Sequence, residues 1–177
     1  MTEKLIISWD DYNKTVEKLA LMVHESGYRP TLLVGIMRGA APMIDVLSRV
    51  FKLKCAYLAV ESYSGKGVED EQGDIVFSRE MSSIAKNMGG KILLCDDLSD
   101  TGITLNKSVD WLKKYQPIKD KIEDIKTATL WKKKKSTFNP DFCAVHLKSN
   151  PWLLQCFESP WEELTIDDLK KRHKKKG

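Results

Sequence analysis

Three carboxylates stand between an apolar run and a small polar turn in residues 91–105, KILLCDDLSDTGITL: Asp96, Asp97 and Asp100. The junction of a strand, a turn and a helix usually binds anions, because the first helical amides lack partners and the helix dipole favours negative charge. The turn of residues 99–104 adds hydroxyl groups to such amides, so it suits a phosphate monoester. Asp96 and Asp97 can accept hydrogen bonds from two adjacent hydroxyls or help to hold a hard cation. A phosphate and a diol at this separation describe a ribose 5-phosphate.

Other common sites for phosphate or covalent chemistry are absent from the sequence. There is no GxxxxGK[ST] motif, and no GxGxxG follows a predicted strand, which argues against a P-loop enzyme and a dinucleotide-binding fold. The four cysteines are too scattered for a zinc or redox pair, and we expect buried thiols in a reducing cytosol. Cys95 lies too deep in a predicted strand to act as a nucleophile.

The pattern of apolar residues predicts strands that alternate with amphipathic helices. Helices are predicted from Ser8 or Asp10 to Gly27, from Pro42 to Val50 and from Leu105 onward, and strands at 31–36, 55–60, 75–77, 92–95, 125–131 and 142–147. This order predicts an α/β fold with a parallel sheet between helices. Ligands bind such sheets at the carboxyl ends of the strands, where the loops 37–40 and 61–73 and the acidic stretch lie.

Length and composition predict a single cytoplasmic domain. The 177 residues suffice for one core, which we place at residues 1–169, and no apolar stretch nears the roughly 20 residues of a membrane span. No signal peptide is visible at the N-terminus. The net charge of +4 comes from residues 170–177, where six of the 29 basic residues lie. We expect this tail to be solvated and disordered, which argues against nucleic acid as a partner.

The segment ILLCDDLSDTGIT closely resembles the 5-phosphoribosyl-1-pyrophosphate (PRPP) signature of the type I phosphoribosyltransferases. LLVGIMRGAAP is similar to their pyrophosphate loop, and ATLWKKKKSTFNPDF to the segment that reads the purine oxygen. PWLLQCFESPWEEL resembles the base-binding hood of the small bacterial and archaeal hypoxanthine, guanine or xanthine enzymes. The resemblance covers residues 4 to about 165. It implies the type I phosphoribosyltransferase fold, with a small C-terminal hood mainly at 148–165.

Matched residue by residue, the PRPP signature implies two roles for the three acids. Asp96 and Asp97 would hold the ribose 2- and 3-hydroxyls and help to place Mg²⁺, whereas Asp100 would face N7 of the purine and assist proton movement there. The 5-phosphate would be wrapped, largely by backbone amides, by Ser99, Thr101, Gly102, Ile103 and Thr104.

The resemblance also implies a pyrophosphate site and a mobile loop. Arg38 and Gly39 would bind the pyrophosphate, and the family's cis peptide is predicted between Met37 and Arg38. Ser62 and Tyr63 would open a long loop that closes over PRPP and excludes water.

For the base, Lys133 matches the lysine that reads the 6-oxo group, although Lys132, Lys134 and Lys135 leave this assignment open by one position. Trp152 would stack on the purine, with Phe157 as its rival, and Leu153 would offer backbone groups to the base edge. The spacing between Trp152 and Pro160-Trp161 departs from the family pattern, and Glu162 would replace a metal-facing aspartate.

The resemblance therefore implies purine salvage: a 6-oxopurine and PRPP give a nucleoside monophosphate and pyrophosphate, with Mg²⁺ as cofactor. Related enzymes are commonly dimers or tetramers, so we expect a homo-oligomer. Two alternatives remain at this stage. One is a regulator with the PRPP fold that binds nucleic acid through its lysines, and the other is an enzyme for a non-purine base.

Overall fold

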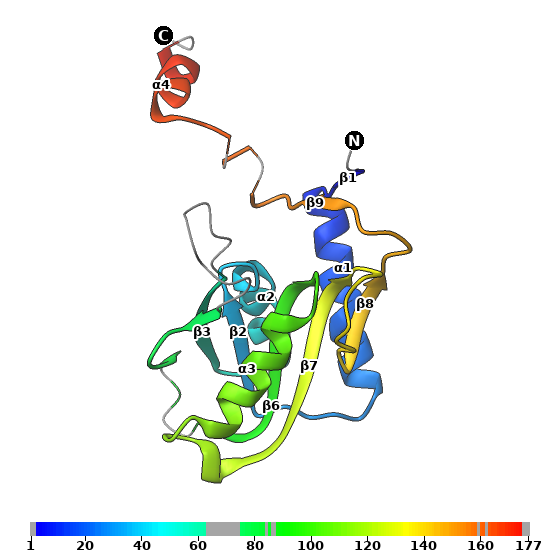
Figure 1. Cartoon of the computed structure of the whole chain (residues 1–177), viewed down its shortest axis with the longest axis vertical. Coiled ribbons are helices and arrows are strands. Elements are labelled where there is room, and N and C mark those ends of the chain that lie inside the picture. The colour runs from blue at the N-terminus through cyan, green and yellow to red at the C-terminus, as the bar shows by residue number, and fades with distance from the viewer. Residues whose placement is uncertain are drawn as a thin grey trace, which may run out of the picture. The chain divides into compact units, whose positions relative to one another are not determined.

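The computed structural model of the protein describes residues 3–62, 75–83, 85, 88–158, 160–161 and 163–174 (Figure 1). Two compact units are formed, one by residues 15–150 and the other by residues 1–14 together with 151–177. The helices and strands in chain order are β1 (Lys4–Ile6), α1 (Trp9–Glu25), β2 (Leu32–Met37), α2 (Ala41–Phe51), β3 (Cys55–Ser62), β4 (Ile75–Phe77), β5 (Ser82–Ser83), β6 (Gly90–Ser99), α3 (Ile103–Lys114), a 3-10 helix (Lys119–Lys121), β7 (Ile122–Lys132), β8 (Phe142–His146), β9 (Trp152–Leu154) and α4 (Ile166–Lys174).

In the part of the chain that the structure describes, a seven-stranded sheet forms the centre of the larger unit. The strands follow the order β4-β3-β2-β6-β7-β8, and β5 pairs with β3. The neighbours from β3 to β8 are parallel, whereas β4 and β5 pair antiparallel with β3 at one edge. The predicted α/β fold with a mainly parallel sheet is confirmed.

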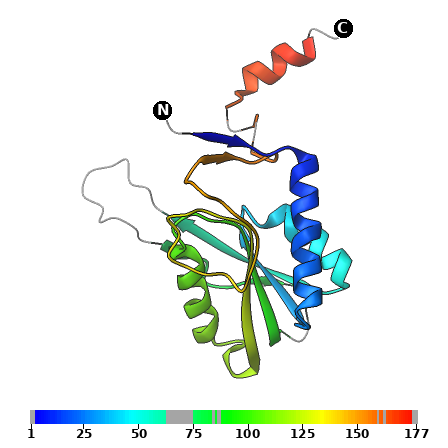
Figure 2. The same ribbon diagram turned by 90° about the vertical axis from the view of Figure 1, so that its right-hand side faces the viewer.

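Helices cover both faces of this sheet. Figure 2 shows α3 on one side and α2, with the later part of α1, on the other. Leu32 and Val34 of β2 belong to one buried cluster with Leu105 and Leu112 of α3. Leu33, which lies between them, points to the opposite face and is also fully buried. Burial on both faces explains why this strand is continuously apolar. No helix among the described residues combines the length and the apolar composition that crossing a membrane requires.

The carboxyl ends of three central strands meet at one edge of the sheet. β2 ends at Met37, β6 at Ser99 and β7 at Lys132. Gly35 pairs with Cys95 and Ser99 pairs with Lys132, so the strands are parallel and in step. The three segments that follow these strands therefore leave the sheet side by side.

The smaller unit joins the two ends of the chain. β1 pairs in parallel with β9, with Leu5 opposite Leu153. The ring of Tyr12 packs edge-on against those of Trp9 and Phe157, with centroid distances of 6.0 and 5.6 Å. The sequence predicts a C-terminal hood, but it does not predict that the N-terminal strand forms part of the same unit.

Part of the predicted disordered tail is helical. Residues 170–174 form the end of α4, and residues 175–177 lie outside the described part. The N-terminus of α4 is capped reciprocally, since the Asp168 N–H donates to Thr165 Oγ1 (3.2 Å) and the Thr165 N–H donates to Asp168 Oδ2 (3.1 Å). The first part of the basic tail, residues 170–174, thus continues a capped helix.

Asp141, the residue before β8, links this strand to β7 through its carboxylate. The buried Thr127 N–H and the Thr127 hydroxyl both donate to Asp141 Oδ2, at 2.8 and 2.9 Å. Asp141→Ala should lower the free energy of unfolding by about 2 kcal/mol, because a buried N–H loses its acceptor. Urea denaturation measures this loss. Asp141→Asn keeps one acceptor oxygen and should lose less, so equal losses in the two variants would contradict the assignment.

Candidate active site

The two acids that begin the acidic stretch lie within β6, because the strand continues to Ser99. Asp96 is only 8% exposed, although the predicted strand of residues 92–95 would have ended just before it. Burial, together with the charge of Asp97, raises the pKa of the Asp96 carboxyl well above its ordinary value. A cation or a pair of hydroxyls beside these carboxylates would relieve that cost.

The loop after β2 approaches the acidic pair closely. A Cβ atom added to Gly39 would lie 2.2 Å from Oδ1 of Asp97, so only glycine lets the backbone pass beside that carboxylate. The peptide bond between Met37 and Arg38 is cis, as predicted. Arg38 is exposed. The structure therefore brings the predicted pyrophosphate loop and the predicted sugar-binding acids together.

The phosphate turn, residues 99–104, leads into α3 and includes its first two residues, Ile103 and Thr104. Gly102 caps this helix with φ +89°, a left-handed conformation that favours glycine. Thr101 and Ile103 are exposed, and the first amides of α3 have no partners within the helix. These features suit an anion. Ser99 differs from the other predicted phosphate residues. It is 1% exposed, and its hydroxyl forms a hydrogen bond with the hydroxyl of Ser136.

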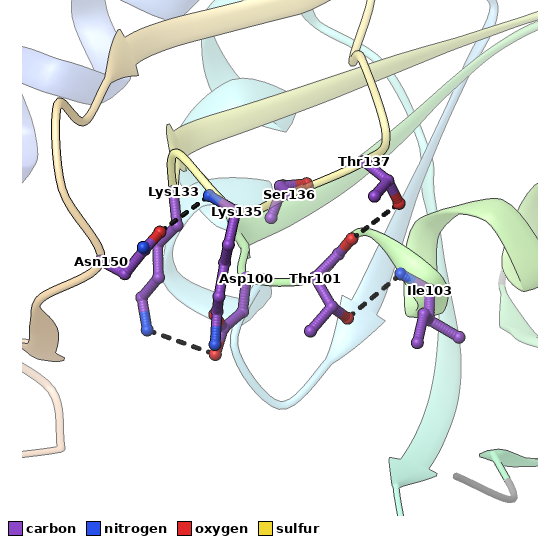
Figure 3. A network of polar contacts seen from close by, with 9 residues as sticks. Asp100, Thr101, Ile103, Lys133, Lys135, Ser136, Thr137 and Asn150 are labelled. Atoms are coloured by element: carbon purple, nitrogen blue, oxygen red, sulfur yellow. Dashed lines mark hydrogen bonds and ion pairs between the residues drawn. The ribbon is translucent and has the colours of Figure 1, made fainter.

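The hydroxyl of Ser99 ties the phosphate turn to the lysine turn, residues 132–138. Ser99 Oγ lies 2.7 Å from Ser136 Oγ, and the Thr137 N–H donates to the Thr101 carbonyl at 3.0 Å. The Thr137 hydroxyl donates to the same carbonyl at 3.2 Å (Figure 3). A Cβ atom added to Gly102 would lie 2.4 Å from that of Phe138. The two turns therefore pack as one piece.

This packing places Lys133 beside Asp100. Lys133 is 5% exposed, and its Nζ lies 3.2 Å from Asp100 Oδ2, which supports the predicted choice of Lys133 within the lysine run. Lys135 Nζ lies 2.8 Å from the other oxygen, Oδ1 (Figure 3). Burial alone would raise the pKa of Asp100, but the ammonium groups of Lys135 and Lys133 outweigh it and hold that pKa below its ordinary value. The sequence analysis did not predict this second ion pair of Asp100, which Lys135 forms. The lysine run of residues 132–135 was the only sequence feature that pointed to it.

Trp152, Leu153 and Phe157 belong to the smaller unit. Trp152 is 58% exposed, whereas the Phe157 ring packs against Tyr12. This favours Trp152 over Phe157 as a platform for a base. The Trp152 N–H donates to the Glu3 carbonyl, so the backbone groups of the next residue, Leu153, face away from β1. Leu153 can therefore offer its N–H and C=O at an edge of β9 that pairs with no other strand among the described residues.

Three of the predicted site side chains lie outside the described part of the chain. Tyr63 and Glu162 lie outside the described residues, and so does the side chain of Ser62. Cys95 is fully buried, and burial raises the pKa of its thiol, so it offers no nucleophile.

The acidic pair fits Mg²⁺ in its chemistry. This cation prefers oxygen ligands and is commonly held by one or two carboxylates together with substrate phosphates. Asp96 and Asp97 supply such oxygens, and the raised pKa of Asp96 marks a buried carboxyl that a cation would stabilise in its charged form. No group of three or more His, Cys, Asp or Glu residues gathers among the described residues, so an all-protein metal cage is not indicated there.

Together, these loops define the class of protein: an α/β fold that presents an acidic pair, a phosphate turn and a buried lysine at one edge of a parallel sheet. The sequence pattern of the family described as "Phosphoribosyl transferase domain" matches residues 8–163. The chain belongs to this family and is a phosphoribosyltransferase.

Individual relatives agree with this family. The hypoxanthine-guanine phosphoribosyltransferase of Aquifex aeolicus is 31% identical over 147 residues, which are 78% of this chain and 77% of the relative. That of Bacillus subtilis is 29% identical over 147 residues, with 79% and 76% covered. The xanthine-guanine-hypoxanthine phosphoribosyltransferase of Helicobacter pylori superposes with a TM-score of 0.72 at 22% identity, covering 96% of this chain and 99% of that one, and shows the same fold.

The buried acid has a measurable effect on stability. Above about pH 4 the Asp96 carboxyl is ionised in the unfolded chain, whereas its raised pKa keeps it protonated in the folded chain. The free energy of unfolding therefore falls as the pH rises above about 4, and below that pH Asp96 has no such effect. Without Mg²⁺ at pH 7, Asp96→Asn should therefore unfold at a higher denaturant concentration than the wild type. This difference should shrink as the pH falls toward 4. The control is Asp110→Asn on the exposed side of α3; a similar gain in both variants would refute the explanation.

Proposed function

We propose that this protein transfers the 5-phosphoribosyl group from PRPP to a 6-oxopurine, giving the nucleoside monophosphate and pyrophosphate in purine salvage. The family supports the transfer, and the names of the Aquifex aeolicus and Bacillus subtilis relatives support hypoxanthine or guanine as the base. The name of the Helicobacter pylori neighbour adds xanthine as a candidate.

The pair formed by Lys133 and Asp100 is the observation on which this proposal rests. A 6-oxopurine presents an acceptor oxygen at C6 and, beside it, a nitrogen at N7 that can carry a proton. The Lys133 ammonium only donates hydrogen bonds, and an ionised Asp100 only accepts them. Their 3.2 Å separation places a donor next to an acceptor, in the order that this edge of the base needs.

The remaining residues suit the sugar and its leaving group. Cleavage of the bond at C1 of the ribose builds positive charge on the ring and negative charge on the departing pyrophosphate. Arg38 and the amides of its loop would stabilise the pyrophosphate, while the phosphate turn holds the 5-phosphate. Asp96 and Asp97 would accept hydrogen bonds from the ribose hydroxyls. They would also hold Mg²⁺, which when bound neutralises pyrophosphate charge.

Base selectivity tests the proposal. With PRPP and Mg²⁺, the wild type should use hypoxanthine or guanine, and possible use of xanthine is tested in the same screen. Adenine should be a poor substrate, because its amino group would face the Lys133 ammonium donor to donor. A buried mismatch of this kind costs on the order of 10⁴-fold in kcat/KM. Lys133→Ala should lower activity with 6-oxopurines and narrow the gap to adenine. Equal turnover of adenine and hypoxanthine by the wild type would sink the proposal.

Asp100 provides a second test. If its carboxylate manages the proton at N7, Asp100→Asn should lower kcat by roughly 10²-fold or more while PRPP binding changes little. Steady-state kinetics measure the first quantity and calorimetry the second. Unchanged turnover would remove Asp100 from the reaction.

A further inference from the structure

Asp100 has a cation on each of its two oxygens, and only one of these cations has a role in the proposed function. Lys133 lies against Oδ2 and Lys135 against Oδ1. The two lysines differ in burial: the side chain of Lys133 is 6% exposed and that of Lys135 is 47% exposed. The three groups together have a net charge of +1.

The backbone holds Lys135 in this position. The Ser136 N–H donates to the Lys133 carbonyl at 3.0 Å, which closes a tight turn with Lys135 in its middle. The Lys135 N–H itself donates to Asn150 Oδ1 at 2.7 Å (Figure 3). The Thr137 N–H then bonds to Thr101, next to Asp100. Several backbone hydrogen bonds therefore fix the position of Lys135, whereas the side chain of an exposed lysine usually has no single position.

A second cation changes what Lys133 can do. A carboxylate that has a single ammonium partner draws that ammonium to itself, and a buried ammonium then has fewer donors for another acceptor. With Lys135 on Oδ1, Asp100 keeps a charged partner even when Lys133 donates to a ligand. Oδ2 remains open to a proton donor.

We propose that Lys135 is a positioning residue of this transferase: it holds Asp100 by Oδ1, so that Oδ2 faces the N7 proton and Lys133 is released to the 6-oxygen of the base. This inference rests on the proposed function. It gives the lysine turn two distinct tasks, one lysine for the base and one for the acid beside it.

The charges predict how this role appears in a pH profile. Lys135 and Lys133 are the charged groups that contact Asp100 among the described residues, and both lower its pKa. Without Lys135, Asp100 would take up a proton at a higher pH. The acidic limb of the plot of kcat/KM against pH should then shift to higher pH.

The test compares Lys135→Gln with Lys135→Arg and with the matched control Lys134→Gln. Lys134 is exposed and neighbours Lys135 in the same turn, but no ion pair to Asp100 is formed by it in the described structure. For hypoxanthine with PRPP and Mg²⁺, Lys135→Gln should lower kcat/KM roughly tenfold and shift the acidic limb to higher pH. KM for PRPP should stay the same. Lys135→Arg should restore most of the activity, and Lys134→Gln should behave as the wild type.

Each other result overturns the inference. An unchanged kcat/KM in Lys135→Gln would mean that the ion pair between Lys135 and Asp100 does not contribute to the reaction. A loss at every pH without movement of the acidic limb, or an equal loss in Lys134→Gln, means that the turn has merely been disturbed. If Lys135→Gln narrowed the gap between hypoxanthine and adenine, Lys135 would read the base itself. Failure of the wild type to use any 6-oxopurine would refute the proposed function, and with it this inference, whereas normal wild-type transfer with an unaffected Lys135→Gln refutes the inference alone.

Discussion

The pairing of Ser99 with Lys132 is the constraint on which the candidate site depends. Because β6 and β7 are parallel and in register, they end side by side. The first residues after the two strands therefore leave the sheet next to each other. Those next residues are Asp100 and Lys133. The Lys133 N–H donates to the Ser99 carbonyl at 3.0 Å, which continues the ladder by one more bond. A shift of β7 by a single residue would send each side chain to the opposite face, and the donor and acceptor would separate.

The sequence predicted the parts of this arrangement that depend on local pattern. Continuous apolar runs located the buried strands, and the PRPP motif pointed to the acids and the phosphate turn. The same motif indicated the family, and the comparison confirms the family. The cis peptide before Arg38 was also predicted correctly, through resemblance and not through any local signal. These features depend on residues that lie close together along the chain.

The features that were missed depend on residues far apart along the chain. The burial of Asp96 follows from the extension of β6 to Ser99, and an Asp-Asp pair looks like a strand end when only its own polarity is considered. The ion pair of Lys135 with Asp100 depends on a turn that packs against residues 35 to 37 positions earlier. The pairing of β1 with β9 joins residues 4–6 to residues 152–154, and three-residue strands are too short for a periodic signal.

That last pairing sets an order of events during synthesis of the protein. The partners of β1 leave the ribosome 148 residues after it, since Lys4 pairs with Trp152, so residues 4–6 cannot form this ladder until residue 154 has emerged. Throughout that time they have an unused row of backbone donors and acceptors. The larger unit needs neither strand for its sheet. A nascent chain can therefore complete its sheet, and the turns that hold Asp100 and Lys133, before the strand that bears Trp152 exists.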